Sequence, residues 1–227
     1  DKNYYASGGD IWARKMGVLV SGAKPVYCAP IMLSLPNILT ILRLAAAPGV
    51  VIMFLYFNRP AADWFALVLF VTAALTDFLD GYLARRWKQE SKLGAMLDPI
   101  ADKAMVVIAL LVITGFSGMD PYILLPATVI MFREVFVSGL REFLGDTAGL
   151  LKVTQLAKWK TTAQMVAIAI LFAKGAFEHY DGVEALSTFV TWWVGIIALW
   201  IAGILTLLTG WDYFRKAQPY LVGGPVQ

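Results

Sequence analysis

The sequence has very few of the residues that build disulfide frameworks and transition-metal sites. Among 227 residues there is one cysteine, Cys28, and one histidine, His179. A disulfide framework, a zinc finger and any site that needs two imidazole ligands are therefore excluded within this sequence. We assign no role to either residue.

Charged residues are also scarce. Asp, Glu, Lys and Arg make up 15% of the sequence, while apolar residues make up 59%; a soluble globular domain carries about 25% and 45–50%, respectively. So little polar surface argues against a soluble enzyme and against a protein that binds nucleic acid. The sequence instead predicts an all-α polytopic membrane protein that is surrounded by membrane lipids.

Six segments are apolar and long enough to cross a bilayer, which takes roughly 20 helical residues. Turn-like stretches that contain Asn, Asp, Gly and Pro separate them. The predicted transmembrane helices cover residues 38–57, 63–83, 94–116, 121–143, 161–177 and 186–210. We therefore divide the chain into a juxtamembrane segment (1–34), a six-helix domain (35–217) and a tail (218–227).

Lysine and arginine are unevenly distributed between the two ends of the predicted helices. They cluster in the second and fourth connections and after the sixth helix, whereas the other connections hold mostly Asp and Glu. Cytoplasmic loops of membrane proteins are enriched in Lys and Arg. Both termini are therefore predicted to face the cytoplasm.

Four aspartates lie at the ends of the second and third predicted helices, where charge is expensive. A carboxylate near the bilayer costs about 2.5–3.5 kcal/mol on insertion scales and is a functional candidate. Asp77 and Asp80 are three residues apart, and Asp98 and Asp102 are four apart, so each pair projects from one helix face. The short connection makes these helices antiparallel neighbours, and the two pairs are expected to face each other.

Four converging carboxylates repel one another unless cations neutralise them. Oxygen ligands without imidazole or thiolate favour magnesium, calcium or manganese over zinc or copper. Ion pairs with Arg85 and Arg86 are an alternative for one or two of the acids, and a cation-transport path is an alternative for all four. Transport is disfavoured because the acids crowd at one side of the membrane, beside a basic connection.

The aspartates also belong to a longer pattern with fixed spacing. The run Asp77-x2-Asp80-Gly81-x2-Ala84-Arg85-x8-Gly94-x3-Asp98-x3-Asp102 matches the signature of the CDP-alcohol phosphotransferases at every position. The resemblance implies a six-helix fold with a polar cavity at the cytoplasmic side, and a homodimer. It also implies transfer of a phosphatidyl group from CDP-diacylglycerol to an alcohol in a bacterial inner membrane. Membrane prenyltransferases also use aspartates and magnesium, but with a different spacing on a larger bundle.

Further stretches resemble those members of the family that use sn-glycerol 3-phosphate as the acceptor. They cover residues 35–43, 132–135, 138–143 and 158–165. The products implied are phosphatidylglycerol phosphate and CMP. Serine, inositol phosphate and phosphatidylglycerol stay open as other acceptors.

The resemblance also implies a role for each signature residue. Asp77, Asp80, Asp98 and Asp102 are expected to hold divalent ions, with two magnesium ions favoured and manganese possible. Asp102 is further expected to act as the base that deprotonates the acceptor hydroxyl. The residues expected to bind the cytidine donor are Asn37, Thr40, Gly81, Ala84 and Arg85. Close helix packing is the other interpretation of Gly81 and Ala84.

Four basic residues form the predicted acceptor site: Arg133, Arg141, Lys158 and Lys160. A phosphate monoester needs cationic hydrogen-bond donors, and the planar arginine fork suits it well. Arg133 is the most informative, because it lies inside a predicted transmembrane helix. An ion pair with Glu134 or Glu142 is the alternative for Arg133, and membrane topology is the alternative for the two lysines.

Overall fold

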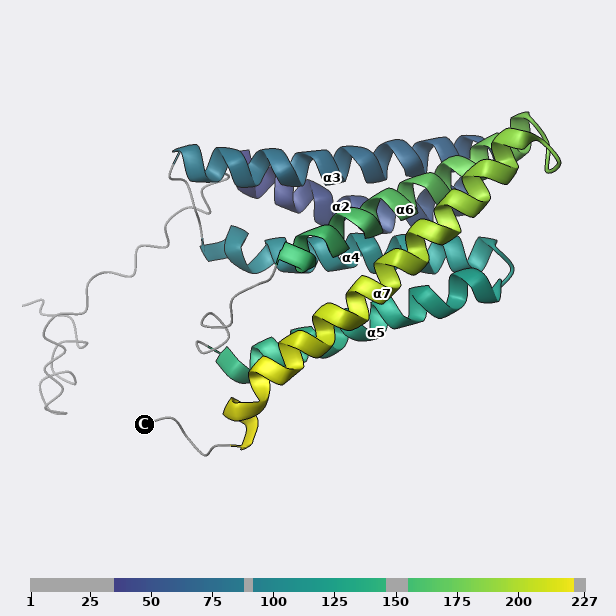
Figure 1. Ribbon diagram of the computed structural model, residues 1–227. Coiled ribbons are helices and arrows are strands. Elements are labelled where there is room, and N and C mark those ends of the chain that lie inside the picture. Colours follow the sequence, from purple (N-terminus) through teal and green to yellow (C-terminus); the bar gives the residue numbers. More distant parts are fainter. Residues whose placement is uncertain (1–34, 88–91, 146–154, 223–227) are drawn as a thin grey trace, which may run out of the picture. The chain divides into compact units, whose positions relative to one another are not determined.

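The computed structural model describes the backbone of residues 35–87, 92–145 and 155–222, all within the unit Ser34–Gln227 (Figure 1). Side chains are described for these residues except 35–36, 77–87, 92–93, 95, 157–158 and 222. The predicted juxtamembrane segment lies outside the described residues. The side chains of Asp77, Asp80, Gly81, Ala84, Arg85 and Lys158 lie outside them as well.

All regular secondary structure in the described residues is helical, which confirms the predicted all-α fold class. Its helices are α2 (Leu35–Tyr56), α3 (Ala61–Trp87), α4 (Lys92–Phe116), α5 (Pro121–Leu144), α6 (Gln155–Tyr180) and α7 (Leu186–Val222). They follow the six predicted segments in order. The largest differences are at the start of α6 and the end of α7, where polar residues continue the helix beyond the apolar run. The predicted tail therefore begins inside α7.

Three described helices are long and apolar enough to cross a membrane. Their apolar stretches are Asn37–Tyr56, Pro121–Leu144 and Leu186–Leu221. Large apolar side chains such as Leu55, Val135 and Phe143 point outward and are at least 70% exposed, as lipid-facing positions require. The protein is therefore an integral membrane protein, and a crossing by α3, α4 and α6 stays a prediction.

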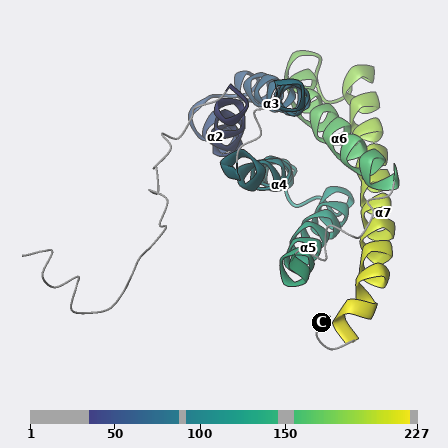
Figure 2. The same cartoon turned by 90° about the vertical axis from the view of Figure 1, so that its left-hand side faces the viewer.

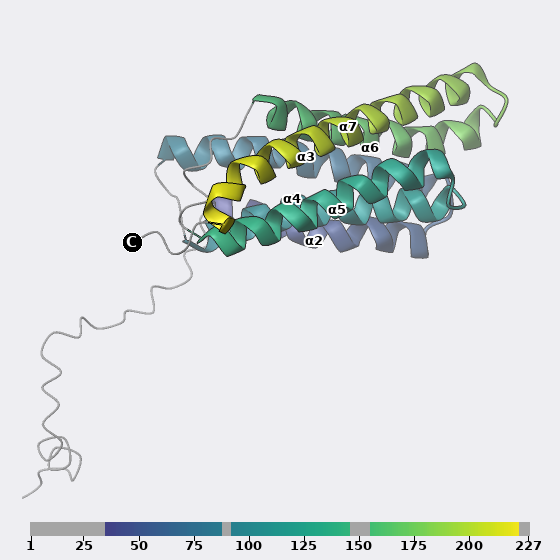
Figure 3. The ribbon, with the colours of Figure 1, turned by 60° about the horizontal axis from the view of Figure 1, so that its bottom comes forward.

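Small side chains bring the helices close together. α2 packs against α3 and α4 (Figure 2), and Ala46, Ala47 and Val50 of α2 are buried in the shared core. The first half of α7 lies along α6, where Gly195 contacts Leu171, and its second half crosses to α5 (Figure 3). Small residues allow this close approach, which is how helices associate in lipid.

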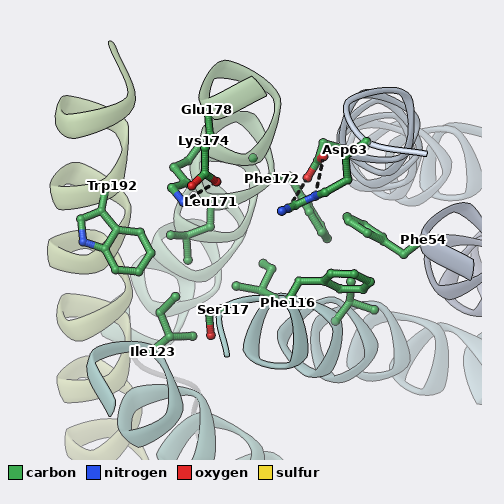
Figure 4. Close-up of a pocket in the computed structure, with 14 residues that line it drawn as sticks. Phe54, Asp63, Phe116, Ser117, Ile123, Leu171, Phe172, Lys174, Glu178 and Trp192 are labelled. Carbon is green, nitrogen blue, oxygen red and sulfur yellow. Dashed lines mark hydrogen bonds and ion pairs between the residues drawn. The ribbon is translucent and has the colours of Figure 1, made fainter. Parts of the chain in front are cut away.

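Two ion pairs lie at the end of the bundle where α2 and α4 end. Arg59 donates two hydrogen bonds to the buried Asp63, at 2.9 and 2.7 Å, and Lys174 pairs with Glu178 at 2.7 Å. With Trp192 and other aromatic side chains they surround a cavity of about 240 Å³ (Figure 4). Each of these two cations has its own carboxylate, so the charges here balance.

Gly175 of α6 permits this arrangement, because a Cβ atom there would overlap the Asp63 carboxylate and lie 2.8 Å from Arg59 Nη2. We expect Gly175→Ala to lower the free energy of unfolding by about 1–3 kcal/mol through overpacking. The midpoint of thermal unfolding in detergent measures this. Gly139→Ala is the matched control: its Cβ would meet nothing within 4 Å, so alanine should match or raise the midpoint. Equal midpoints for the two variants would contradict the prediction.

Candidate active site

Asp98 and Asp102 lie one turn apart near the start of α4, and α2 holds both of them. The Thr40 hydroxyl donates a hydrogen bond to Asp98 at 2.8 Å. Arg43 Nη1 donates to Asp102 Oδ1 at 3.1 Å and lies 3.9 Å from Asp98 Oδ1. Thr40 and Arg43 are buried, whereas the two carboxylates are almost half exposed. The buried Thr40 and Arg43 of α2 therefore hold two carboxylates of α4 that stay partly exposed.

This geometry bears on two predicted donor-binding residues. Thr40 contacts an aspartate of the signature, and Asn37 is buried one turn earlier on the same helix. Thr40 therefore belongs to the surroundings of the aspartates, and Asn37 precedes it by one turn on the buried face of α2. Their contact with a cytidine stays a prediction.

Arg43 was not among the predicted site residues. Its position inside an apolar stretch is nevertheless the signal that singled out Arg133, because an arginine in lipid needs a partner. The partners of Arg43 are the α4 carboxylates, more than fifty residues away in the sequence. The same criterion applied to every charged residue of the predicted helices would have found it.

Of the other signature residues, Gly94 lies on the first turn of α4 and the rest lie on the last turns of α3. Ala73 and Ala74, one turn before Asp77, line a very small cavity together with Arg43 and Asp102. This contact brings the signature end of α3 toward the aspartates of α4. The donor set of the signature consists of carboxylates, which fits a hard divalent ion such as magnesium or manganese.

Arg133 and Lys160 meet at one carboxylate, Glu134. Arg133 Nη1 lies 3.3 Å from Glu134 Oε1, and Lys160 Nζ donates to the same oxygen. The three side chains are only 7–13% exposed. Among the described side chains, two cations therefore share one anion in a site that water barely reaches, and positive charge is in excess there.

The contact with Glu134 is one of the two alternatives considered for Arg133. The other candidate partner, Glu142, is exposed. The ion pair does not use the whole guanidinium, because Nη2 also reaches Thr209 Oγ1 of α7 at 3.4 Å. Glu134 itself was considered only as a partner for Arg133, and its second bond to Lys160 could not be foreseen from sequence spacing.

Arg141 lies two turns after Arg133 on α5. Its Cζ atom is 5.1 Å from the centre of the Tyr213 ring of α7, within the range of a cation–π contact. Lys158 lies on the first turn of α6, and its side chain is outside the described set. The structure thus brings Arg133 and Lys160 together, and it places Arg141 beside Tyr213.

An apolar groove of about 470 Å³ runs past Arg133 between α5 and α7. Its lining consists almost wholly of large apolar side chains: Phe132, Phe136, Leu207, Leu208, Trp211 and Phe214. The cationic cluster is therefore bordered by a surface that suits a lipid chain.

Removal of the shared carboxylate should destabilise the protein. Glu134→Gln keeps an acceptor oxygen but leaves Arg133 and Lys160 without a counter-charge, and breaking a buried ion pair costs about 3–5 kcal/mol. We expect a clear fall in the midpoint of thermal unfolding. The exposed Glu142→Gln is the matched control and should change stability by less than about 0.5 kcal/mol.

A second variant tests the cause of that effect. In Glu134→Gln/Lys160→Met one cation is removed along with the carboxylate, so part of the lost stability should return. Equal midpoints for Glu134→Gln and Glu142→Gln, or no recovery in the double variant, would contradict the shared-carboxylate interpretation.

Comparison with known proteins places this sequence in a family. The model of the family described as CDP-alcohol phosphatidyltransferase matches residues 33–208. A CDP-diacylglycerol–glycerol-3-phosphate 3-phosphatidyltransferase of Cereibacter sphaeroides is 63% identical over 215 residues, covering 83% of this chain and 97% of that protein. Proteins with the same name from Rickettsia bellii and Haemophilus influenzae are 42% and 38% identical, and cover 82% and 83% of this chain and 97% and 96% of their own lengths. The family match spans most of the chain and both halves of the site, and the chain therefore belongs to the CDP-alcohol phosphatidyltransferase family of membrane enzymes.

Proposed function

We propose that this enzyme transfers the phosphatidyl group of CDP-diacylglycerol to sn-glycerol 3-phosphate, forming phosphatidylglycerol phosphate and CMP. The observation that carries the proposal is the excess buried positive charge of Arg133 and Lys160 around Glu134. A buried cation in excess favours an acceptor that carries a phosphate group. The names of the relatives, all described as acting on glycerol 3-phosphate, support the same acceptor.

The α4 aspartates suit the other substrate. Members of this family depend on divalent metal ions, and Asp77, Asp80, Asp98 and Asp102 would hold them, with two magnesium ions the favoured set. Such ions, when bound, neutralise the pyrophosphate of the donor and the charge that develops on CMP. Arg43 keeps Asp98 and Asp102 in place on the α2 side.

Asp102 is our candidate for the general base. Its carboxylate is held by Arg43 Nη1 at 3.1 Å and is almost half exposed, so that an oxygen is available to the acceptor hydroxyl. The acceptor hydroxyl oxygen would attack the phosphorus that carries the diacylglycerol, and its proton would pass to Asp102. The bond from that phosphorus to the oxygen of CMP would break, and CMP would leave with the electron pair.

The remaining predicted residues are assigned to the donor or to the acceptor. Asn37, Thr40, Gly81, Ala84 and Arg85 would surround the cytidine phosphate, and the apolar groove between α5 and α7 suits an acyl chain of the donor. Arg141 and Lys158 would extend the acceptor site from Arg133 and Lys160. The groove and the cations together fit an enzyme that joins a lipid to a water-soluble phosphate.

We further infer the location and assembly of the enzyme. The bacterial relatives favour the inner membrane, and the basic connections favour a site and termini on the cytoplasmic side. The family resemblance favours a homodimer. The division into residues 1–34, 35–217 and 218–227 remains our domain proposal.

The function is tested by CMP release from the purified protein with CDP-diacylglycerol and magnesium. Parallel reactions contain glycerol 3-phosphate, serine, inositol phosphate or phosphatidylglycerol, each with and without EDTA. We expect release with glycerol 3-phosphate alone, and its loss with EDTA. Release with a different acceptor would overturn the acceptor assignment while keeping the donor chemistry. No release with any acceptor would overturn the function itself.

Asp102→Asn tests the base. The amide oxygen can still accept from Arg43, so the variant should fold and retain the donor, whereas kcat should fall by at least about 10²-fold. Turnover is measured as CMP release, and donor binding is measured by calorimetry. Asp212→Asn, which removes a half-exposed carboxylate paired with Lys216 on α7, should leave kcat unchanged. Substantial turnover by Asp102→Asn would remove this residue as the base.

A further inference from the structure

Three uncharged polar side chains are buried beside the cationic cluster without a hydrogen-bond partner for one of their atoms. Within the described part of the chain, these atoms are Gln164 Nε2, Thr206 Oγ1 and Tyr213 Oη. Gln164 is 2% exposed, Thr206 is fully buried and Tyr213 is 7% exposed. Buried polar groups are nearly always hydrogen-bonded, so each of these three atoms needs an explanation.

Thr206 and Tyr213 lie on the face of α7 that packs against α5. A Cβ atom on Gly203 would lie 3.4 Å from Pro126, and one on Gly210 would lie 3.0 Å from Arg133 Cγ. Thr206 comes between these two contacts, one turn from each. Tyr213 follows Gly210 by three residues and lies under the Arg141 guanidinium. Both residues therefore lie on the side of α7 that packs against α5 near Arg133 and Arg141, two of the residues predicted to bind the acceptor.

Gln164 reaches the same region from α6. It lies four residues after Lys160, one helical turn further along the same face. Lys160 Nζ in turn contacts Glu134 of α5. Gln164 of α6 and Thr206 of α7 are thus each about one helical turn from a residue that lies in the Arg133–Glu134–Lys160 cluster or contacts it.

The chemistry of these three groups differs from that of the cations. An amide and two hydroxyl groups exchange hydrogen bonds with another hydroxyl, but they carry no charge to bind a phosphate. The phosphate is already provided for by the excess positive charge of Arg133 and Lys160. The part of the acceptor that remains to be recognised is its carbon chain with the hydroxyl groups.

On the basis of the function proposed above, we infer that Gln164, Thr206 and Tyr213 form an uncharged wall that recognises the acceptor hydroxyl not consumed in the reaction. In glycerol 3-phosphate this is the hydroxyl on the central carbon. A site built to bond a hydroxyl discriminates strongly against an acceptor that lacks it, because buried polar groups are then left unpaired. The wall thereby determines acceptor specificity. Tyr213 lies beyond the residues that the family model matches.

The experiment compares glycerol 3-phosphate with 3-hydroxypropyl phosphate, which differs only by lacking the central hydroxyl. The full-length enzyme and its Thr206→Val, Tyr213→Phe and Gln164→Met variants are assayed by CMP release with both acceptors. For the unmodified enzyme, loss of the central hydroxyl should lower kcat/KM by at least about 10-fold. In each variant, kcat/KM for glycerol 3-phosphate should fall by about 5-fold or more, whereas kcat/KM for 3-hydroxypropyl phosphate should fall much less.

Two control variants separate recognition from folding. Thr206→Ser keeps the hydroxyl and should keep the discrimination. Thr191→Val makes the same change on α7, about 22 Å along the helix from Thr206, and should change neither acceptor's kinetics. The KM for CDP-diacylglycerol should stay constant in all of them.

The outcomes are distinguishable from failure of the proposed function. If the unmodified enzyme releases no CMP with glycerol 3-phosphate, the acceptor assignment fails first. If it does, but Thr206→Val, Tyr213→Phe and Gln164→Met all discriminate between the two acceptors as the unmodified enzyme does, the wall is overturned. Equal losses with both acceptors would also overturn it, because they would indicate a structural role.

Discussion

The cost of placing charge inside lipid governs how this molecule is arranged. At the end of the bundle away from Asp98 and Asp102, Arg59 is paired with Asp63 and Lys174 is paired with Glu178. Each of these two cations therefore has one anion. At the other end the pairing is unequal. Arg43 contacts two aspartates of α4, whereas Glu134 contacts two cations, Arg133 and Lys160. Because unpaired buried charge is expensive, this unequal pairing distinguishes a binding site from a structural one.

The two unequal clusters have opposite signs and lie on different helices. Among the described side chains, carboxylates are in excess between α2 and α4, where a divalent metal ion would reduce the imbalance of charge. The cations are in excess between α5 and α6, where a phosphate monoester would do so. The ion pairs of each cluster are made within that cluster, between α2 and α4 in one case and between α5 and α6 in the other.

The limits of sequence reasoning follow from the same physics. Hydropathy was sufficient to find the six helices, and the spacing of Asp98 and Asp102 was sufficient to place them on one face. Apolar runs do not mark where a helix ends, so the polar start of α6 and the last turns of α7 were missed. Arg43 carried the signal of a charge in lipid, but its partners are distant in sequence. No such signal marks Gln164, Thr206 and Tyr213, because uncharged polar residues are common in apolar helices.

The division of the site also bears on how one fold can serve several acceptors. The signature residues all lie on α3 and α4, and Thr40 and Arg43 of α2 contact two of them; in the proposed function this part would bind the cytidine donor that gives the family its name. Alternative acceptors differ in charge, size and number of hydroxyl groups, and in the proposed function those properties would be recognised by α5, α6 and α7. Because α7 crosses from α6 to α5, a change in one of its uncharged residues can alter the acceptor surface without disturbing the aspartates. Specificity can therefore change through hydrogen-bonding residues of α7 while the charge pairs that hold the bundle together stay in place.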